Sequence, residues 1–155
     1  MVKHSAGIVL CRATDDDHVE ILLAHPGGPF WAGKNEHGWS IPKGEFDPDG
    51  EAAIAAARRE FAEEIGTPAP GEDALEPLAV VKASGKHIHP FLGWGHFDPA
   101  DLVSNTTQIE WPPRSGSQIT IPEVDAVAWI RLEDAESFLH KGQARVVALV
   151  RAALA

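Results

Sequence analysis

Apolar and polar positions along the chain alternate between two patterns. Residues 5–13 and 18–25 are runs rich in β-branched residues and leucine, and the turn-forming Asp15-Asp16-Asp17 separates them, so they predict a β-hairpin. The same pattern predicts further strands at residues 75–83, 87–96, 107–111, 118–121 and 126–131. Helical patterns follow from about residue 133 and near residues 143–154.

The clearest predicted helix lies between residues 51 and 66. Apolar side chains recur there at three- and four-residue steps, at Ile54, Ala57, Phe61 and Ile65. One apolar stripe of this kind packs a helix against a sheet. Asp49 or Gly50 can cap its start, and Gly66 can end it.

The order of these elements predicts one α/β domain over residues 1–155. A length of 155 residues fits a single domain, and 44% hydrophobic residues suffice for a core. Strands and helices are mixed along the chain, and no internal repeat or linker interrupts them. A single core is therefore expected.

A long connector runs from Phe30 to His37, after the breaker Pro26-Gly27-Gly28-Pro29. Long ordered loops in small domains are often functional, which makes this segment a candidate binding loop. A nucleobase could stack on Phe30 and Trp31 while Lys34 contacts a distal phosphate. The alternative is that Trp31 only covers the edge of the sheet.

Composition excludes several classes of protein. The formal net charge of −10 argues against binding duplex nucleic acid. No apolar run approaches the roughly 20 residues that cross a bilayer, and the N-terminal segment lacks the pattern of a secretory signal. Cys11 is the single cysteine, so no internal disulfide can form. We expect a cytoplasmic protein with no membrane partner.

Acidic residues are concentrated between Gly44 and Gly66, where seven acids and two bases leave a net charge of −5. Glu60, Glu63 and Glu64 project from one side of the predicted helix, and like charges at this spacing repel. Either the carboxylates form a solvated face or divalent cations neutralise them. Ligands that are all oxygen suit Mg²⁺ or Mn²⁺ better than zinc.

Residues 44–66 resemble the Nudix box, G-x5-E-x7-R-E-U-x-E-E-x-G-U. The run Arg59-Glu60-Phe61-Ala62-Glu63-Glu64-Ile65-Gly66 matches the helical part, and seven residues separate Glu51 from Arg59. Six residues rather than five separate Gly44 from Glu51, and Thr67 stands at the last aliphatic position. The segments HPGGPFW, WSIPKGE and EWPPRSG extend the similarity toward a bacterial branch of the family.

The resemblance implies an α/β/α sandwich around a mixed sheet and metal-dependent hydrolysis of a nucleoside diphosphate linked to another group. It also implies a small nucleotide substrate, because the segments are most similar to those of hydrolases that act on an NTP or a dinucleoside polyphosphate. Glu60 and Glu64 would be the principal Mg²⁺ ligands, with Glu63 a further ligand and the Gly44 carbonyl completing the shell. Arg59 and Glu51 would form an orienting ion pair.

Other candidates lie outside the helix. Lys43, beside Gly44, can offer a point charge to a phosphate, and Arg114 is a second cation of this kind. The general base can come from Glu123, our first choice, from Glu110, or from Glu63 within the helix. A non-catalytic module that senses a nucleotide or metabolite on a Nudix scaffold is the alternative to an enzyme. The sequence leaves the exact substrate and the oligomeric state open.

Overall fold

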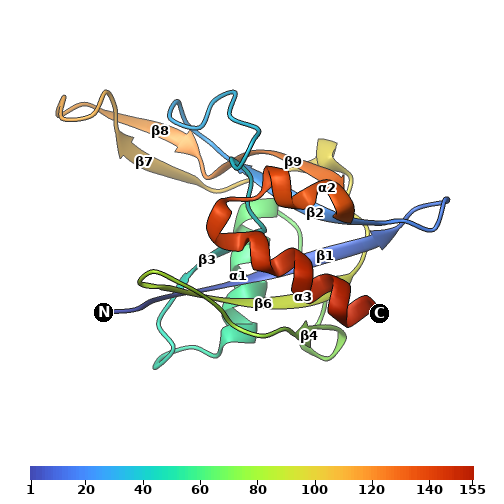
Figure 1. The fold of residues 1–155 in the computed structure, drawn as a ribbon. Helices are drawn as coiled ribbons and strands as arrows, with labels where there is room; N and C mark the ends of the chain where they lie inside the picture. Colours follow the sequence, from blue (N-terminus) through green and yellow to red (C-terminus); the bar gives the residue numbers. More distant parts are fainter.

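The computed structural model describes residues 1–155. A seven-stranded sheet contains β1 (Lys3–Ala13), β2 (Val19–Pro26), β3 (Lys43–Phe46), β4 (Glu76–Pro77), β5 (Val81–Ala83), β6 (Lys86–Trp94) and β9 (Val124–Arg131). A separate two-stranded sheet contains β7 (Thr106–Glu110) and β8 (Gln118–Pro122). The helices are α1 (Ala53–Ile65), α2 (Leu132–Phe138) and α3 (Ala144–Leu154) (Figure 1), with short 3₁₀ turns at Glu72–Ala74, Pro99–Asp101 and Lys141–Gln143.

Strand β1 is the centre of the larger sheet. It runs parallel to the whole of β6, from Lys3 opposite Lys86 to Cys11 opposite Trp94. Its other edge is shared by two antiparallel partners, because β3 pairs with its first half and β2 with its last residues. The sheet is therefore mixed, as the resemblance implied, and β3 is held where the chain enters α1.

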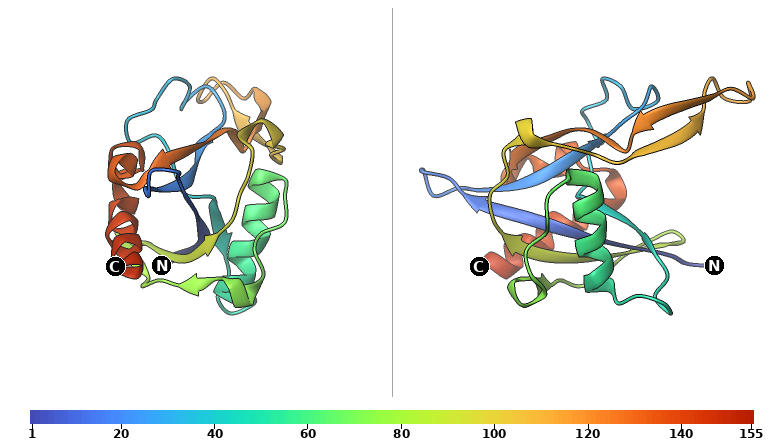
Figure 2. Two further views of the ribbon diagram at one scale, coloured as in Figure 1. Left: turned by 90° about the vertical axis from the view of Figure 1, so that its right-hand side faces the viewer. Right: turned by 180° about the vertical axis from the view of Figure 1, so that it is seen from behind.

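Helices cover both faces of this sheet (Figure 2). Along β1, Ile8 and Leu10 face α1, whereas Val9 and Cys11 face α2 and α3. Because both faces are buried, the strand is a continuous apolar run rather than an alternation of apolar and polar residues. The predicted α/β/α sandwich is confirmed, with one hydrophobic layer on each side of the sheet.

The β7–β8 hairpin projects away from the sandwich (Figures 1 and 2). Its register places Ile109 opposite Ile119 and Thr107 opposite Ile121. These residues share one face of the hairpin because side chains alternate along a strand. The hairpin therefore presents an apolar strip rather than a second core.

The chain around α1 differs from the sequence-based expectation in two ways. The helix begins at Ala53 rather than near residue 51, and no side chain caps it. Asp47 explains the late start, since its carbonyl accepts the backbone N–H groups of Gly50 and Glu51 and holds residues 47–51 in a turn. Strand β3 was not predicted, because Lys43-Gly44-Glu45-Phe46 has little apolar character. At its other end α1 stops at Gly66, whose φ of 84° suits glycine.

Other boundaries also shift. The single strand expected at residues 75–83 is divided into β4 and β5. Two isolated bridges, from Ser40 to Ala24 and from Trp39 to Leu139, hold the segment before β3. Cys11 is fully buried, and burial raises the pKa of its thiol to about 12. None of the helices has the length and apolar character needed to cross a membrane.

Candidate functional site

The acidic face of α1 packs directly on the backbone of β3. Glu60 is only 9% exposed, and its carboxylate lies against Gly44. A Cβ atom at residue 44 would lie 2.0 Å from Glu60 Oε2, which is closer than two unbonded atoms can approach. Glycine at this position therefore lets the carboxylate reach the strand, and the Gly44 carbonyl belongs to the same neighbourhood.

Arg59 neutralises part of this acidic face. Its Nε and Nη2 atoms donate hydrogen bonds to the two oxygens of Glu51, at 3.0 and 2.9 Å. Its Nη1 donates to Glu60 Oε1 at 2.8 Å and lies 3.5 Å from Glu63 Oε1. The additional residue between Gly44 and Glu51 is absorbed in the turn before α1, so Glu51 still reaches Arg59. These contacts lower the pKa of Glu51 and raise that of Arg59.

Glu64 is the most strongly perturbed acid of the site. Burial, followed by the charges of Glu60 and Glu123, raises its pKa to about 8, although the backbone N–H of Lys43 donates to Glu64 Oε1 at 3.2 Å. Burial also raises the pKa of Glu60, and burial together with the charge of Glu63 raises that of Glu123. Four carboxylates thus crowd a partly desolvated region with too little protein charge to balance them.

The chemistry of these donors fits a divalent cation. Glu60 Oε2 and Glu64 Oε2 accept no hydrogen bond, because the protein partners of both side chains use only Oε1. Hard cations such as Mg²⁺ prefer carboxylate, carbonyl and water oxygens. No three His, Cys, Asp or Glu side chains are arranged as a ready metal cluster, since Arg59 lies between Glu60 and Glu63. Binding therefore requires some of these side chains to turn.

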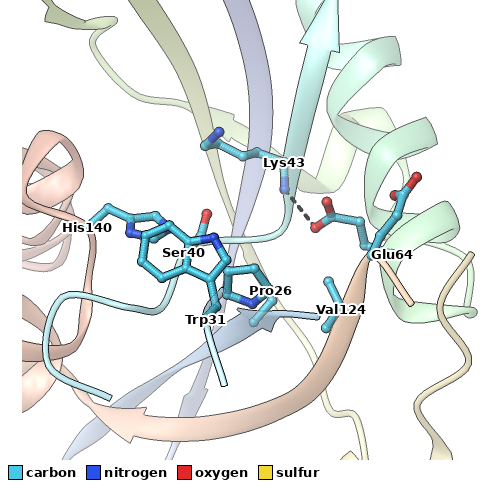
Figure 3. Close-up of a pocket in the computed structure, with 9 residues that line it drawn as sticks. Pro26, Trp31, Ser40, Lys43, Glu64, Val124 and His140 are labelled. Carbon is cyan, nitrogen blue, oxygen red and sulfur yellow. Dashed lines mark hydrogen bonds between the residues drawn. The ribbon is translucent and has the colours of Figure 1, made fainter. Parts of the chain in front are cut away.

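Two adjoining pockets open beside the carboxylates. The first, of about 230 Å³, is lined by Glu64, Glu123, Lys43, Trp31, Ser40 and His140. Glu64 lies on one side of it and Trp31 and His140 on the other, and the Lys43 side chain extends from the Glu64 side toward His140 (Figure 3). Trp31 packs on His140, with ring centres 4.9 Å apart. Burial lowers the pKa of Lys43 despite the neighbouring charge of Glu64.

The second pocket, of about 460 Å³, continues from the first over shared Trp31, Glu64 and Glu123. Its walls come from two separate segments, the loop with Phe30 and Trp31 and the apolar strip of the β7–β8 hairpin with Ile109 and Ile121. An apolar cleft with a few charged groups at one end is typical of small-molecule sites. The two pockets together have the size of a nucleotide site.

Some candidate residues lie outside these pockets. Lys34 does not line them, and its Nζ rests 3.9 Å from the centre of the Phe30 ring. Arg114 is exposed at the tip of the β7–β8 hairpin, away from the carboxylates. Glu110 accepts the backbone N–H groups of Arg114 and Gly116, so it shapes the hairpin turn. Of the two candidate bases beyond the helix, only Glu123 lines the pockets.

Sequence reasoning missed the contribution of the C-terminal part. His140 follows α2 and lines the first pocket, although no motif marks it. Gln143, which is 2% exposed, donates to Ser40 Oγ and accepts the N–H of Ile41, and thereby fixes the segment before Lys43. The one signal in the sequence was the position of Gln143, a polar residue directly before the apolar run of residues 144–154.

Comparisons with known proteins agree with this geometry. Residues 1–150 match the family model described as NUDIX domain. An uncharacterised 17.7 kDa protein of Enterobacteria phage T4 is 32% identical over 127 residues, which are 81% of this chain and 80% of the phage protein. An RNA pyrophosphohydrolase of Caulobacter vibrioides is 41% identical over 54 residues, but these are only 32% of this chain and 31% of that enzyme.

Solved structures give the same result for the whole fold. A C. elegans Ap4A hydrolase in a binary complex superposes with a TM-score of 0.61 at 25% identity, covering 99% of this chain and 98% of that chain. The NUDIX domain of Shewanella oneidensis NrtR complexed with ADP ribose gives a TM-score of 0.63 at 18% identity, covering 100% and 90%. The chain therefore belongs to the Nudix family.

Proposed function

We propose that the protein is a Mg²⁺-dependent hydrolase of nucleoside diphosphates linked to another group, with an NTP or a dinucleoside polyphosphate as substrate. The observation that supports this most is that Glu64 and Glu123 line both pockets, so the carboxylate site opens into a cleft of nucleotide size. Mn²⁺ is an acceptable substitute, because it prefers the same oxygen ligands. Two of the similar proteins, an Ap4A hydrolase and an RNA pyrophosphohydrolase, are consistent with this substrate class.

We assign the cation to Glu60 and Glu64, with Glu63 and the Gly44 carbonyl as additional ligands. When bound, the cation supplies charge stabilisation for the phosphate oxygens and acidifies a water molecule. Arg59, held by Glu51, orients Glu60 through its 2.8 Å hydrogen bond. Lys43 offers its ammonium group to a phosphate from the wall of the first pocket.

Glu123 is our candidate for the general base. It lies in both pockets beside Glu64, and its raised pKa favours uptake of a proton at moderate pH. Glu63 is the competitor on α1, but its carboxylate already lies 3.5 Å from Arg59.

Phe30 and Trp31 are proposed to hold the nucleobase, facing Ile109 and Ile121 across the second pocket. This wall presents aromatic faces and aliphatic groups rather than an array of hydrogen-bonding side chains, so it favours stacking over recognition of one particular base. Lys34 rests on the Phe30 ring and could contact a distal phosphate only after leaving it. Arg114 could contribute only if the hairpin bends toward the cleft.

A substrate panel tests the proposed activity. The purified protein is incubated with Mg²⁺ and NTPs, dinucleoside polyphosphates, ADP-ribose or sugar nucleotides, and the released nucleotide and phosphate products are measured. Hydrolysis of NTPs or dinucleoside polyphosphates with chelator-sensitive turnover supports the proposal. Tight binding without any product across the panel would favour the sensing module instead.

Removing both principal ligands should abolish cation binding. The double variant Glu60→Gln and Glu64→Gln is expected to lose roughly 100-fold or more in Mg²⁺ affinity, because neutral amides replace two charged oxygen donors. Isothermal titration calorimetry measures the affinity, and Glu136→Gln on the exposed surface of α2 serves as the control. Unchanged affinity and turnover in the double variant would place the metal elsewhere.

The base assignment predicts unequal effects for two glutamates. Glu123→Gln should lower kcat by roughly two to four orders of magnitude with little change in melting temperature. Glu110→Gln should be mild, because a glutamine oxygen can still accept from the hairpin turn. Steady-state kinetics of both variants decides the matter, and the reverse ranking would assign the base to Glu110.

The stacking role of Trp31 can be separated from a structural one. Trp31→Ala should raise KM about tenfold, since stacking of a base contributes on the order of 1 to 3 kcal/mol, and should leave the melting temperature unchanged. Trp94→Ala is the matched control, because Trp94 is 50% exposed and lines neither pocket. A large loss of stability with an unaltered KM would show that Trp31 only covers the sheet edge.

A further inference from the structure

A buried histidine connects the loop with Phe30 and Trp31 to the strand that follows Glu123. His25, at the end of β2, is 6% exposed. Its Nδ1 lies 2.9 Å from Asp125 Oδ1 on β9, and its Nε2 lies 3.0 Å from the backbone carbonyl oxygen of Lys34. The ring is thus bonded on both sides to segments that form opposite parts of the site.

Both partners of His25 are hydrogen-bond acceptors. A neutral imidazole carries one N–H group, so it can donate to the carboxylate or to the carbonyl but not to both. The two bonds exist together only when both ring nitrogens carry a proton.

The contacts of His25 lie close to the wall that Phe30 and Trp31 form in the second pocket. Lys34 also donates its backbone N–H to the carbonyl of Trp31 at 3.0 Å, so the two peptide groups that flank its Cα are both held. Trp39, at the other end of the loop, packs edge-on against the His25 ring with centres 5.1 Å apart. The loop is thereby held against β2 and β9 at the point where Trp31 lines both pockets.

We propose that His25 is a positioning residue for nucleotide binding, which through the contacts of both ring nitrogens fixes the Phe30–Trp31 wall relative to Glu123. The proposal rests on the proposed function in one respect, namely that this wall receives the nucleobase. His25 lines neither pocket, so it acts through the loop rather than by touching the substrate.

Binding measurements without Mg²⁺ test this independently of turnover. Calorimetry compares ADP, which has a base, with inorganic pyrophosphate, which has none. His25→Gln should weaken ADP binding about tenfold and change pyrophosphate binding less than about twofold, because only the base depends on the wall. His18→Gln is the matched control, since His18 also contacts an acid, Glu133 at 3.1 Å, but lies exposed at the β1–β2 turn.

A second substitution covers the case in which His25→Gln does not fold. Asp125→Asn keeps the size of the side chain but replaces the carboxylate that contacts His25 Nδ1 by a neutral amide, so it should weaken ADP binding while changing pyrophosphate binding less than about twofold. Equal weakening of ADP and pyrophosphate, or ADP binding that is unchanged in both variants, would overturn the proposal. If the protein hydrolysed no nucleotide yet ADP binding depended on His25 as described, the proposed function would fail and this inference would stand.

Discussion

The packing of Glu60 on Gly44 is the contact on which the site depends. A charged carboxylate is costly to bury unless positive groups or hydrogen bonds compensate it. Here α1 presses Glu60 against β3, and the apolar stripe with Phe61 and Ile65 fixes the helix in that orientation. Hydrophobic burial on one side of α1 thus maintains electrostatic repulsion on the other side, and Arg59 relieves only part of it.

The remaining pieces of the site come from widely separated parts of the chain. Lys43 follows the segment that Gln143 ties down, Trp31 packs on His140, and Ile121 faces the loop from a projecting hairpin. This arrangement divides the cleft into two regions of different chemistry. Carboxylates and Lys43 gather at one end, where phosphates and a cation would lie, and aromatic and aliphatic walls form the other.

Sequence reasoning succeeded where local periodicity carried the information. The stripe along α1 and the spacing from Glu51 to Arg59 predicted the helix, its end at Gly66 and the family. It failed where contacts between distant segments determine which elements form and where they begin. Strand β3 exists because β1 pairs with it, and the start of α1 is delayed because Asp47 holds the preceding turn. His140 and the wall formed by Ile109 and Ile121 enter the site only through folding, so no local pattern marks them.

The most direct test of this account is Mg²⁺ calorimetry on Gly44→Ala, compared with Gly50→Ala. A Cβ at residue 44 would displace the flexible end of Glu60, whereas one at residue 50 would meet its nearest atom at 3.7 Å, an ordinary contact. We expect Gly44→Ala to fold but to bind Mg²⁺ at least about tenfold more weakly, and Gly50→Ala to bind normally. Normal Mg²⁺ affinity in a folded Gly44→Ala protein would contradict the claim that the contact between Glu60 and β3 builds the metal site.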